Sequence, residues 1–220
     1  SIFAIVSGVA GVLALALVRR GPNREKAEEP SNFVASLKGL LSQRDFRWTL
    51  LLFFIGLGIM NTVTAMTDSI AASMGVKDSE GLLGVGLILG GIVGAIVLPN
   101  LSDALGRRKA FLILCMALTI PALWALALAP QGSYALGIAA MSLLGFALMS
   151  AGPIGFQYAA EVTSPVPESA SQGVLLLAGQ ISGLVFTAGM SAGGSPGVKL
   201  WLLAFAITAV VMTLLSFKLH

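Results

Sequence analysis

The feature that most constrains the fold is a succession of apolar runs, each long enough to cross a lipid bilayer as a helix. About 20 predominantly apolar residues suffice for one crossing, and a helix satisfies its own backbone hydrogen bonds where water is absent. Only 10% of the residues are charged, against about 25% in ordinary soluble domains. We therefore expect an all-α, polytopic membrane protein with seven transmembrane helices. The expected spans are residues 1–18, 49–67, 81–99, 110–129, 134–158, 170–192 and 198–217.

The basic residues predict the orientation of these spans. Lys and Arg gather in the loop at 19–47, in the turn after the third span and in the last residues, which seven crossings would bring to one side. That side holds 11 of the 13 basic residues, and the other holds only Lys77 and Lys199. By the positive-inside rule the basic side is cytoplasmic. We expect a multi-pass protein of the cell membrane with its first residue outside and its last residue in the cytoplasm.

The first 47 residues combine an apolar run with a long polar loop. The chain begins at Ser1 inside the apolar run, and no basic segment precedes that run as in a signal peptide. We interpret the chain as part of a longer protein. In the loop, four apolar residues share one helical face, which predicts either an amphipathic helix at the membrane surface or a plain linker helix. The four apolar residues of this face are Phe33, Leu37, Leu40 and Leu41.

Glycine spacing predicts where two helices approach closely. Glycines recur every four residues in the third span, at Gly86, Gly90 and Gly94, and again in the sixth, at Gly179 and Gly183. The fourth and seventh spans contain no glycine. Because glycine-rich and glycine-free spans recur three apart, we expect a repeat of three helices.

A short basic turn between the third and fourth spans matches a known family motif. Its Asp103, Gly106, Arg107 and Arg108 are similar to the Gly-x-x-x-Asp-Arg/Lys-x-Gly-Arg/Lys-Arg/Lys turn of the major facilitator superfamily, whereas Ala104 replaces the basic residue after the aspartate. Pro99 replaces the first glycine of the motif. The turn resembles the second copy of the motif in these transporters, which lies between their helices 8 and 9.

This resemblance implies how the chain is divided. The span at 1–18 would be helix 6 of the N-terminal half, and 19–47 would be the central cytoplasmic loop with its amphipathic helix. Residues 48–220 would form the C-terminal six-helix bundle of a major facilitator fold. Helices 1 to 5 of the same transporter would be missing, and they would be partners of this chain together with the lipid bilayer.

A second resemblance is narrower and concerns the fifth and sixth spans. The stretch from Gly155 to Gly173, followed by Ala178-Gly-Gln180-Ile-Ser-Gly183, is similar to the feline leukaemia virus subgroup C receptor-related transporters and their disrupted-in-renal-carcinoma relative. Gln157 stands where that family usually has Glu, and Ser169 where it has Gly. Members are linked to choline, ethanolamine, haem and vitamin-like organic solutes, so the resemblance implies a small-molecule substrate without identifying it.

The same resemblance implies candidate substrate-binding residues. Gln180 lies near the middle of its span and matches a family glutamine that contacts substrate, although a hydrogen bond between helices would explain it equally well. Asn61 and Thr64, one turn apart in the second span, are similar candidates. Gln157 and Tyr158 follow Gly152-Pro153, which predicts a break or a kink in the fifth span.

Glu161 is the acidic residue with the most specific predicted role. We predict that it pairs with Arg107 or Arg108 as a conformational latch, in a motif that also includes Asp103 and Gly106. The alternative interpretation makes Glu161 a proton carrier.

Three classes of function compete for this sequence. The first is a transporter of a small organic solute that works by alternating access, and the second is a seven-helix membrane receptor. The third is a membrane enzyme, which is disfavoured because no nucleophile–base set, metal cluster or phosphate-binding loop can be assembled from the residues. We expect a transporter, not an enzyme, with no cofactor, no metal and no nucleic-acid partner.

Overall fold

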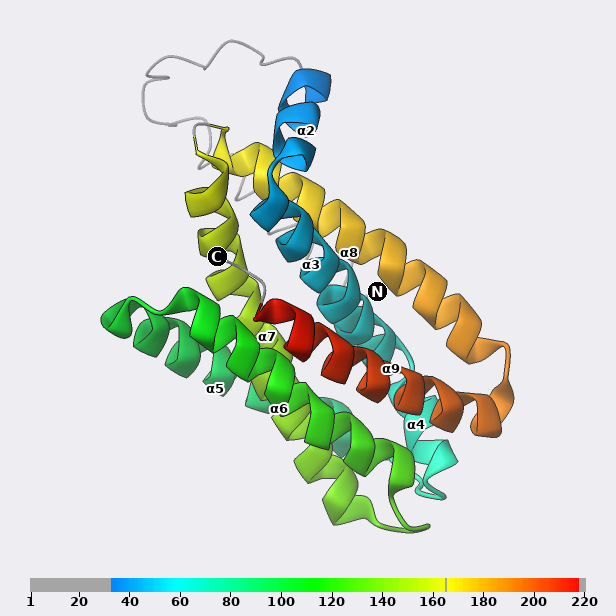
Figure 1. The fold of residues 1–220 in the computed structure, drawn as a ribbon. Helices are drawn as coiled ribbons and strands as arrows, with labels where there is room; N and C mark the ends of the chain where they lie inside the picture. Colours follow the sequence, from blue (N-terminus) through cyan, green and yellow to red (C-terminus); the bar gives the residue numbers. More distant parts are fainter. Residues whose placement is uncertain (1–32, 165, 218–220) are drawn as a thin grey trace, which may run out of the picture. The chain divides into compact units, whose positions relative to one another are not determined.

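The structure is a computed structural model that describes residues 33–164 and 166–217, with side chains from residue 37 onward. All regular elements in these ranges are α-helices, and from Ser36 onward they form one compact unit (Figure 1). Six of the helices are long and apolar enough to cross a membrane, which confirms the all-α, polytopic class. The expected span at 1–18 lies outside the described residues. The helices are α2 (Phe33–Ser42), α3 (Arg44–Ala65), α4 (Thr67–Ser73), α5 (Leu82–Leu105), α6 (Arg108–Leu128), α7 (Tyr134–Thr163), α8 (Glu168–Ser191) and α9 (Gly194–Ser216).

Several helices extend beyond the apolar runs that predicted them. The helix α3 begins at Arg44, five residues before the expected span, and α5 and α7 continue to Leu105 and Thr163. Polar residues outside the hydrocarbon layer can remain helical, and hydropathy detects only the apolar part of such a helix. Gly106 ends α5 because it adopts a left-handed conformation with φ 63°, which favours glycine at a helix C-terminus.

The glycines of α5 face α7. A Cβ atom added at Gly90 would collide with the backbone of Ser142, and one added at Gly94 would collide with the carbonyl of Phe146. On the opposite side of the crossing, a Cβ at Gly145 would meet the carbonyl of Leu87. Small residues on both helices therefore allow their backbones to touch, as the four-residue spacing predicted.

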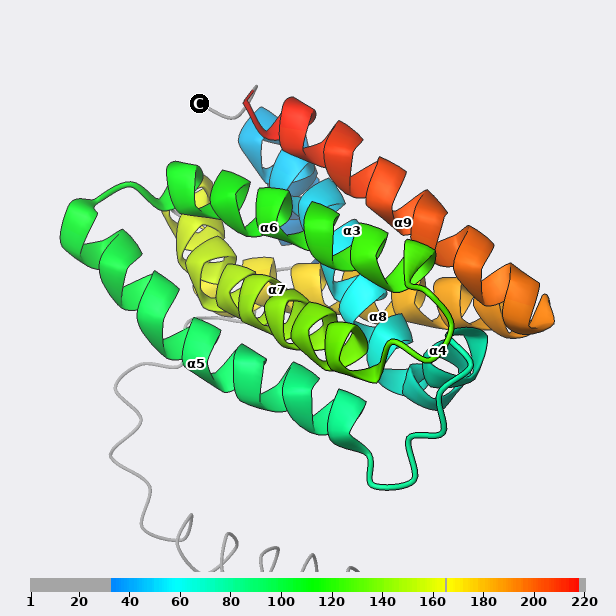
Figure 2. The same cartoon turned by 90° about the horizontal axis from the view of Figure 1, so that it is seen from below.

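The glycines of α8 serve the same purpose against α3. A Cβ at Gly179 would lie 2.6 Å from Leu57 Cβ, and one at Gly183 would lie 2.8 Å from Asn61 Cβ. Thus α5 packs on α7 while α8 packs on α3, so the second helix of each triplet packs on the first helix of the other (Figures 1 and 2). Two three-helix units related by a pseudo-two-fold axis would produce this exchange.

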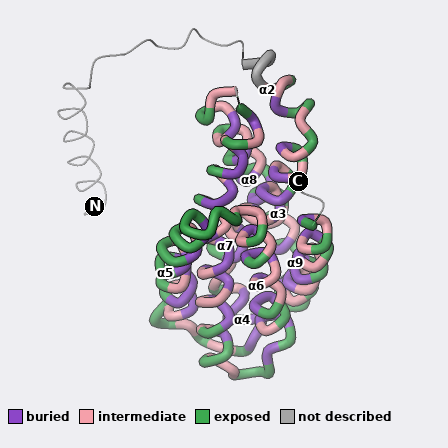
Figure 3. The backbone as a smooth tube through the Cα atoms, turned by 60° about the vertical axis from the view of Figure 1, so that its left-hand side comes forward, coloured by how far each residue is buried: buried purple, intermediate pink, exposed green. Residues whose placement is uncertain are grey.

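Apolar side chains cover much of the outside of the bundle as well as its core. The outer face of α5 is exposed along nearly its whole length (Figure 3), which suits contact with lipid or with other apolar helices. A second, smaller cluster lies at one end, where Leu40 of α2 is fully buried among Phe46, Ala159 and Leu175. One of the four predicted face residues of α2 therefore packs into the bundle, whereas Leu41 is 40% exposed.

Candidate functional site

Gln180 lies near the middle of α8 with its side chain exposed on the surface of the bundle. Its neighbours on that face are exposed apolar residues, of which Leu177 and Leu184 are 57% and 74% accessible. An amide at this depth would face hydrocarbon if the bundle stood alone in a membrane, which is costly. The position therefore suits a face that is covered by a cavity or by further helices.

Asn61 lies beside Gln180 but points to the backbone of α8. Its Nδ2 atom donates a hydrogen bond to the carbonyl of Gly179 at 3.2 Å. One residue further along α3, the Thr62 hydroxyl donates to the carbonyl of Gly183 at 3.4 Å and accepts from Thr187 at 3.2 Å. We call these contacts of Asn61 and Thr62 with α8 the α3–α8 seam. Sequence reasoning assigned no contact to Thr62 or Thr187, because nothing in their spacing shows which helix they face.

Three other predicted substrate residues have different surroundings. Thr64 is exposed, and its hydroxyl donates to the carbonyl of Met60 in its own helix at 2.8 Å. Gln157 is exposed on α7, and its neighbour Tyr158 is buried at the end of the bundle that holds Arg107 and Arg108. The structure thus joins Asn61 to the carbonyl that precedes Gln180, whereas Thr64 and Gln157 are exposed and Tyr158 is buried near Arg107 and Arg108.

The predicted motif residues do meet, at the end of the bundle where α5 passes into α6. We call this the basic end. Arg108 Nη1 lies 2.5 Å from the Glu161 carboxylate, and Nη2 of the same guanidinium lies 3.4 Å from Asp103. Both ion pairs found among the described residues use Arg108, so the predicted pairing of Glu161 is made with this arginine rather than with Arg107.

These charges surround an open cavity of about 370 Å³. The Tyr158 hydroxyl also lies within electrostatic range of two carboxylates, those of Asp45 at the start of α3 and of Glu161. Lys109 donates to the carbonyl of Phe217 at 3.5 Å, which ties the end of α9 to the start of α6. The cavity therefore lies where several helix ends meet, and its lining carries both signs of charge. The lining residues are Asp103, Gly106, Arg107, Arg108, Lys109, Tyr158 and Glu161.

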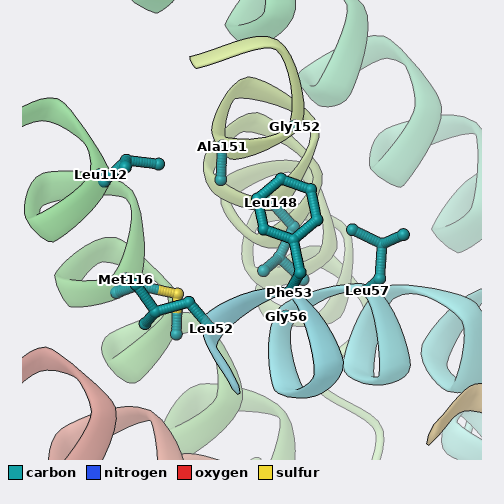
Figure 4. A pocket seen from close by; sticks show the side chains of 9 residues that line it. All are labelled: Leu52, Phe53, Gly56, Leu57, Leu112, Met116, Leu148, Ala151 and Gly152. Atoms are coloured by element: carbon teal, nitrogen blue, oxygen red, sulfur yellow. The ribbon is translucent and has the colours of Figure 1, made fainter. Parts of the chain in front are cut away.

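A second cavity lies between α3, α6 and α7 and is apolar. Figure 4 shows Phe53 from α3, Leu112 from α6 and Gly152 from α7 at its edge. Its volume is about 30 Å³, and its lining residues offer no polar side chain that could hydrogen-bond an organic solute. Pro153 follows Gly152 inside α7, which runs without interruption from Tyr134 to Thr163. The expected alternative of a broken helix is therefore wrong, because the surrounding turns keep their helical conformation despite the missing donor of proline.

At the opposite end of the bundle, Asp78 accepts a set of hydrogen bonds that sequence reasoning did not predict. Asp78 accepts hydrogen bonds from the Tyr134 hydroxyl at 2.5 Å and from the backbone N–H groups of Leu82 and Leu83 at 2.8 and 3.0 Å. Partial burial raises the pKa of Asp78, but these hydrogen bonds together outweigh it and lower that pKa below its ordinary value of 3.8. Asp78 therefore stabilises the start of α5 and joins it to α7. Aspartate shortly before an apolar run is a capping signal, whereas the bond from Tyr134 has no signal in the sequence.

Comparison with known proteins agrees with this architecture. The profile of the Major Facilitator Superfamily matches residues 1–198. Solute carrier family 49 member A3 of Xenopus tropicalis is 29% identical over 163 residues, which cover 73% of this chain and 33% of that protein. The choline/ethanolamine transporter flvcr2b of Danio rerio is 24% identical over 198 residues, which cover 86% of this chain and 41% of that protein. An uncharacterized protein of Archaeoglobus fulgidus is 33% identical over 108 residues, or 49% of each chain.

The matched region spans only 33% and 41% of the lengths of the Xenopus and Danio relatives. The family match favours a transporter over the receptor and membrane-enzyme alternatives, since the named relatives are transporters. It covers most of the chain, and it agrees with the six apolar helices and with the ion pairs at the basic end. The chain therefore belongs to the major facilitator superfamily and is related to its feline leukaemia virus subgroup C receptor transporters.

Proposed function

We propose that this chain is the C-terminal half, with the preceding helix 6, of a transporter that moves a small organic solute across the cell membrane by alternating access. The observation that carries the proposal is the exposed side chain of Gln180 at mid-length of α8. Substrate sites of such transporters lie near the bilayer midplane, between two bundles that rock against each other. Gln180 offers donors and an acceptor at this depth, on a face that the missing helices 1 to 5 would complete.

In this proposal Gln180 and the residues of the basic end have different roles. Gln180 contacts the solute, and Thr64 and Gln157 are also exposed on the same bundle. The basic end lies in the cytoplasm, as the positive-inside rule requires. There Asp103, Arg108 and Glu161 bias the conformational equilibrium. Residues 1–18 would be helix 6 and residues 19–47 the central cytoplasmic loop.

The relatives suggest which solutes to test first. Flvcr2b of Danio rerio and FLVCR1 of Mus musculus are named choline/ethanolamine transporters, so choline and ethanolamine are the leading candidates. Both are small and carry a hydroxyl group that a glutamine amide can hydrogen-bond. Uptake of tritiated choline and ethanolamine by proteoliposomes that contain the full-length protein would test the proposal directly.

The variant Gln180→Ala tests whether this residue binds the solute, as the proposal states. Loss of one hydrogen bond costs about 0.5–1.5 kcal/mol, so we expect the KM for the transported solute to rise about two- to tenfold with expression unchanged. Gln172→Ala, two turns away in the same helix, is the matched control and should leave KM unchanged. If Gln180→Ala instead leaves KM unchanged and lowers thermal stability, the residue joins helices and the proposed site is wrong.

A further inference from the structure

The peptide group that leads into Gln180 is held from the neighbouring helix. A peptide group is planar, so the carbonyl of Gly179 and the N–H of Gln180 move as one unit. The hydrogen bond from Asn61 is made to that carbonyl. Asn61 therefore acts on the backbone of Gln180 directly, and its own Nδ2 atom is already engaged within the protein.

The sequence of α8 makes this restraint necessary. Gly179 and Gly183 stand on either side of Gln180, and glycine loses more conformational freedom in a helix than any other residue. Neither glycine can be enlarged without a clash, because a Cβ atom at Gly179 would meet Leu57 and one at Gly183 would meet Asn61. The close approach of α3 thus requires glycine, which favours the helix least, on both sides of Gln180, and α3 also supplies a donor that restrains this part of α8.

The contact lies where its effect on a solute would be largest. Gly179 is buried against α3 whereas Gln180 is exposed, so one peptide group carries both the internal restraint and the outward side chain. The Ser182 hydroxyl also donates to the Gly179 carbonyl, at 3.0 Å, but from within α8 itself. Only a donor on α3, such as Asn61, relates the direction of the Gln180 side chain to the position of another helix.

We propose that Asn61 is a positioning residue, which orients Gln180 through the Gly179 carbonyl and does not itself touch the transported solute. The inference rests on the proposed function, in which Gln180 makes the contact. It revises the expectation that Asn61 binds substrate.

Thr62 provides a matched control within the α3–α8 seam. Its hydroxyl donates to the carbonyl of Gly183, which belongs to the peptide group of Leu184, one turn beyond Gln180. If each bond restrains its own peptide group, Asn61→Ala should loosen α8 mainly at position 180 and Thr62→Val mainly at position 184. A general loosening of the seam would affect both positions equally in both variants.

Spin labels can separate these outcomes without any solute. In the full-length protein with Cys115→Ser and no other reactive cysteine, a nitroxide is attached at Gln180→Cys or at Leu184→Cys, both of which replace exposed residues. We expect Asn61→Ala to increase label mobility at 180 and leave 184 nearly unchanged, with the reverse pattern for Thr62→Val. Equal effects at both positions, or no effect at 180, would overturn the inference.

A double-mutant cycle with tritiated choline as the probe tests the link to binding. We expect Asn61→Ala and Gln180→Ala each to raise the Kd for choline about two- to tenfold. The double variant should bind choline no more weakly than the single variant with the higher Kd, because both changes remove the same contact. Multiplied effects would mean that Asn61 acts on the solute independently, which contradicts its assignment.

The outcomes distinguish this inference from the proposed function. If Gln180→Ala weakens choline binding but Asn61→Ala does not, the proposed function stands and the positioning role is wrong. If choline binds and Gln180→Ala leaves its Kd unchanged, both are wrong. Should choline fail to bind the unaltered protein, the proposed solute is wrong, and the label mobilities alone decide whether Asn61 restrains Gln180.

Discussion

The ion pair between Arg108 and Glu161 makes the most specific prediction about how the transporter would switch. We expect it to act as a latch that favours one conformation, so Glu161→Gln should shift the equilibrium toward opening at the basic end. The two side chains are 24% and 58% exposed, and such partly exposed pairs contribute about 0–1 kcal/mol. One kcal/mol corresponds to about a fivefold change in an equilibrium constant, which sets the upper limit of the effect.

The assay measures how fast a cysteine at position 180 reacts with a membrane-impermeant thiol reagent added from the basic side. In a Cys115→Ser background, Glu161→Gln and Arg108→Gln should each raise the rate by up to about fivefold. The two changes together should raise it no further than Arg108→Gln alone, because that change already removes the pair with Glu161 as well as the pair with Asp103. Arg107→Gln is the matched control, because the structure pairs Glu161 with the neighbouring arginine.

Two results would refute this reasoning. Additive effects of Glu161→Gln and Arg108→Gln would show that the residues act separately, and an equal effect of Arg107→Gln would show that only net charge matters. A proton carrier makes a different prediction from a latch. In that case Glu161→Gln alone would abolish the pH dependence of transport, with the arginine changes adding a separate defect.

Two further predictions concern stability. Gly90→Ala should destabilise the protein by about 1–3 kcal/mol, because the new Cβ would collide with the backbone of Ser142; thermal unfolding in detergent measures this, and Gly84→Ala, with no atom within 4 Å of the added Cβ, should be neutral or slightly stabilising. Asp78→Asn should cost about 1 kcal/mol through the weakened helix cap. The pKa of Asp78 in the folded protein is lowered from 3.8, so the contribution of Asp78 to stability should be complete above about pH 3.8 and be lost as the pH falls through the lower folded pKa. If Asp78→Asn lowered thermal stability equally at pH 3 and pH 6, this reasoning would be contradicted. Tyr134→Phe should show a smaller effect of the same sign.

The fold class, the approximate helices and the close approaches at glycines could be predicted from the amino-acid sequence. These features are local or periodic: apolar runs follow from the absence of water in the bilayer, and four-residue glycine spacing follows from the turn of the helix. A pairing of Glu161 with the motif at 103–108 could also be predicted, because the number of crossings brings both to the same side. The helix ends were less accurate, since Arg44 and Thr163 are polar and give no hydropathy signal.

Which side chains contact each other between helices became clear only from the tertiary structure. Successive residues on a helix point about 100° apart, so whether Arg107 or Arg108 faces Glu161 depends on how α6 is rotated against α7. The same holds for Asn61, whose amide could have faced a cavity but instead meets the Gly179 carbonyl because glycines let α8 approach. The bond between Asp78 and Tyr134 joins residues that are 56 positions apart, and no local pattern connects them. Contacts of this kind depend on helix rotation and close packing, which a single sequence does not specify.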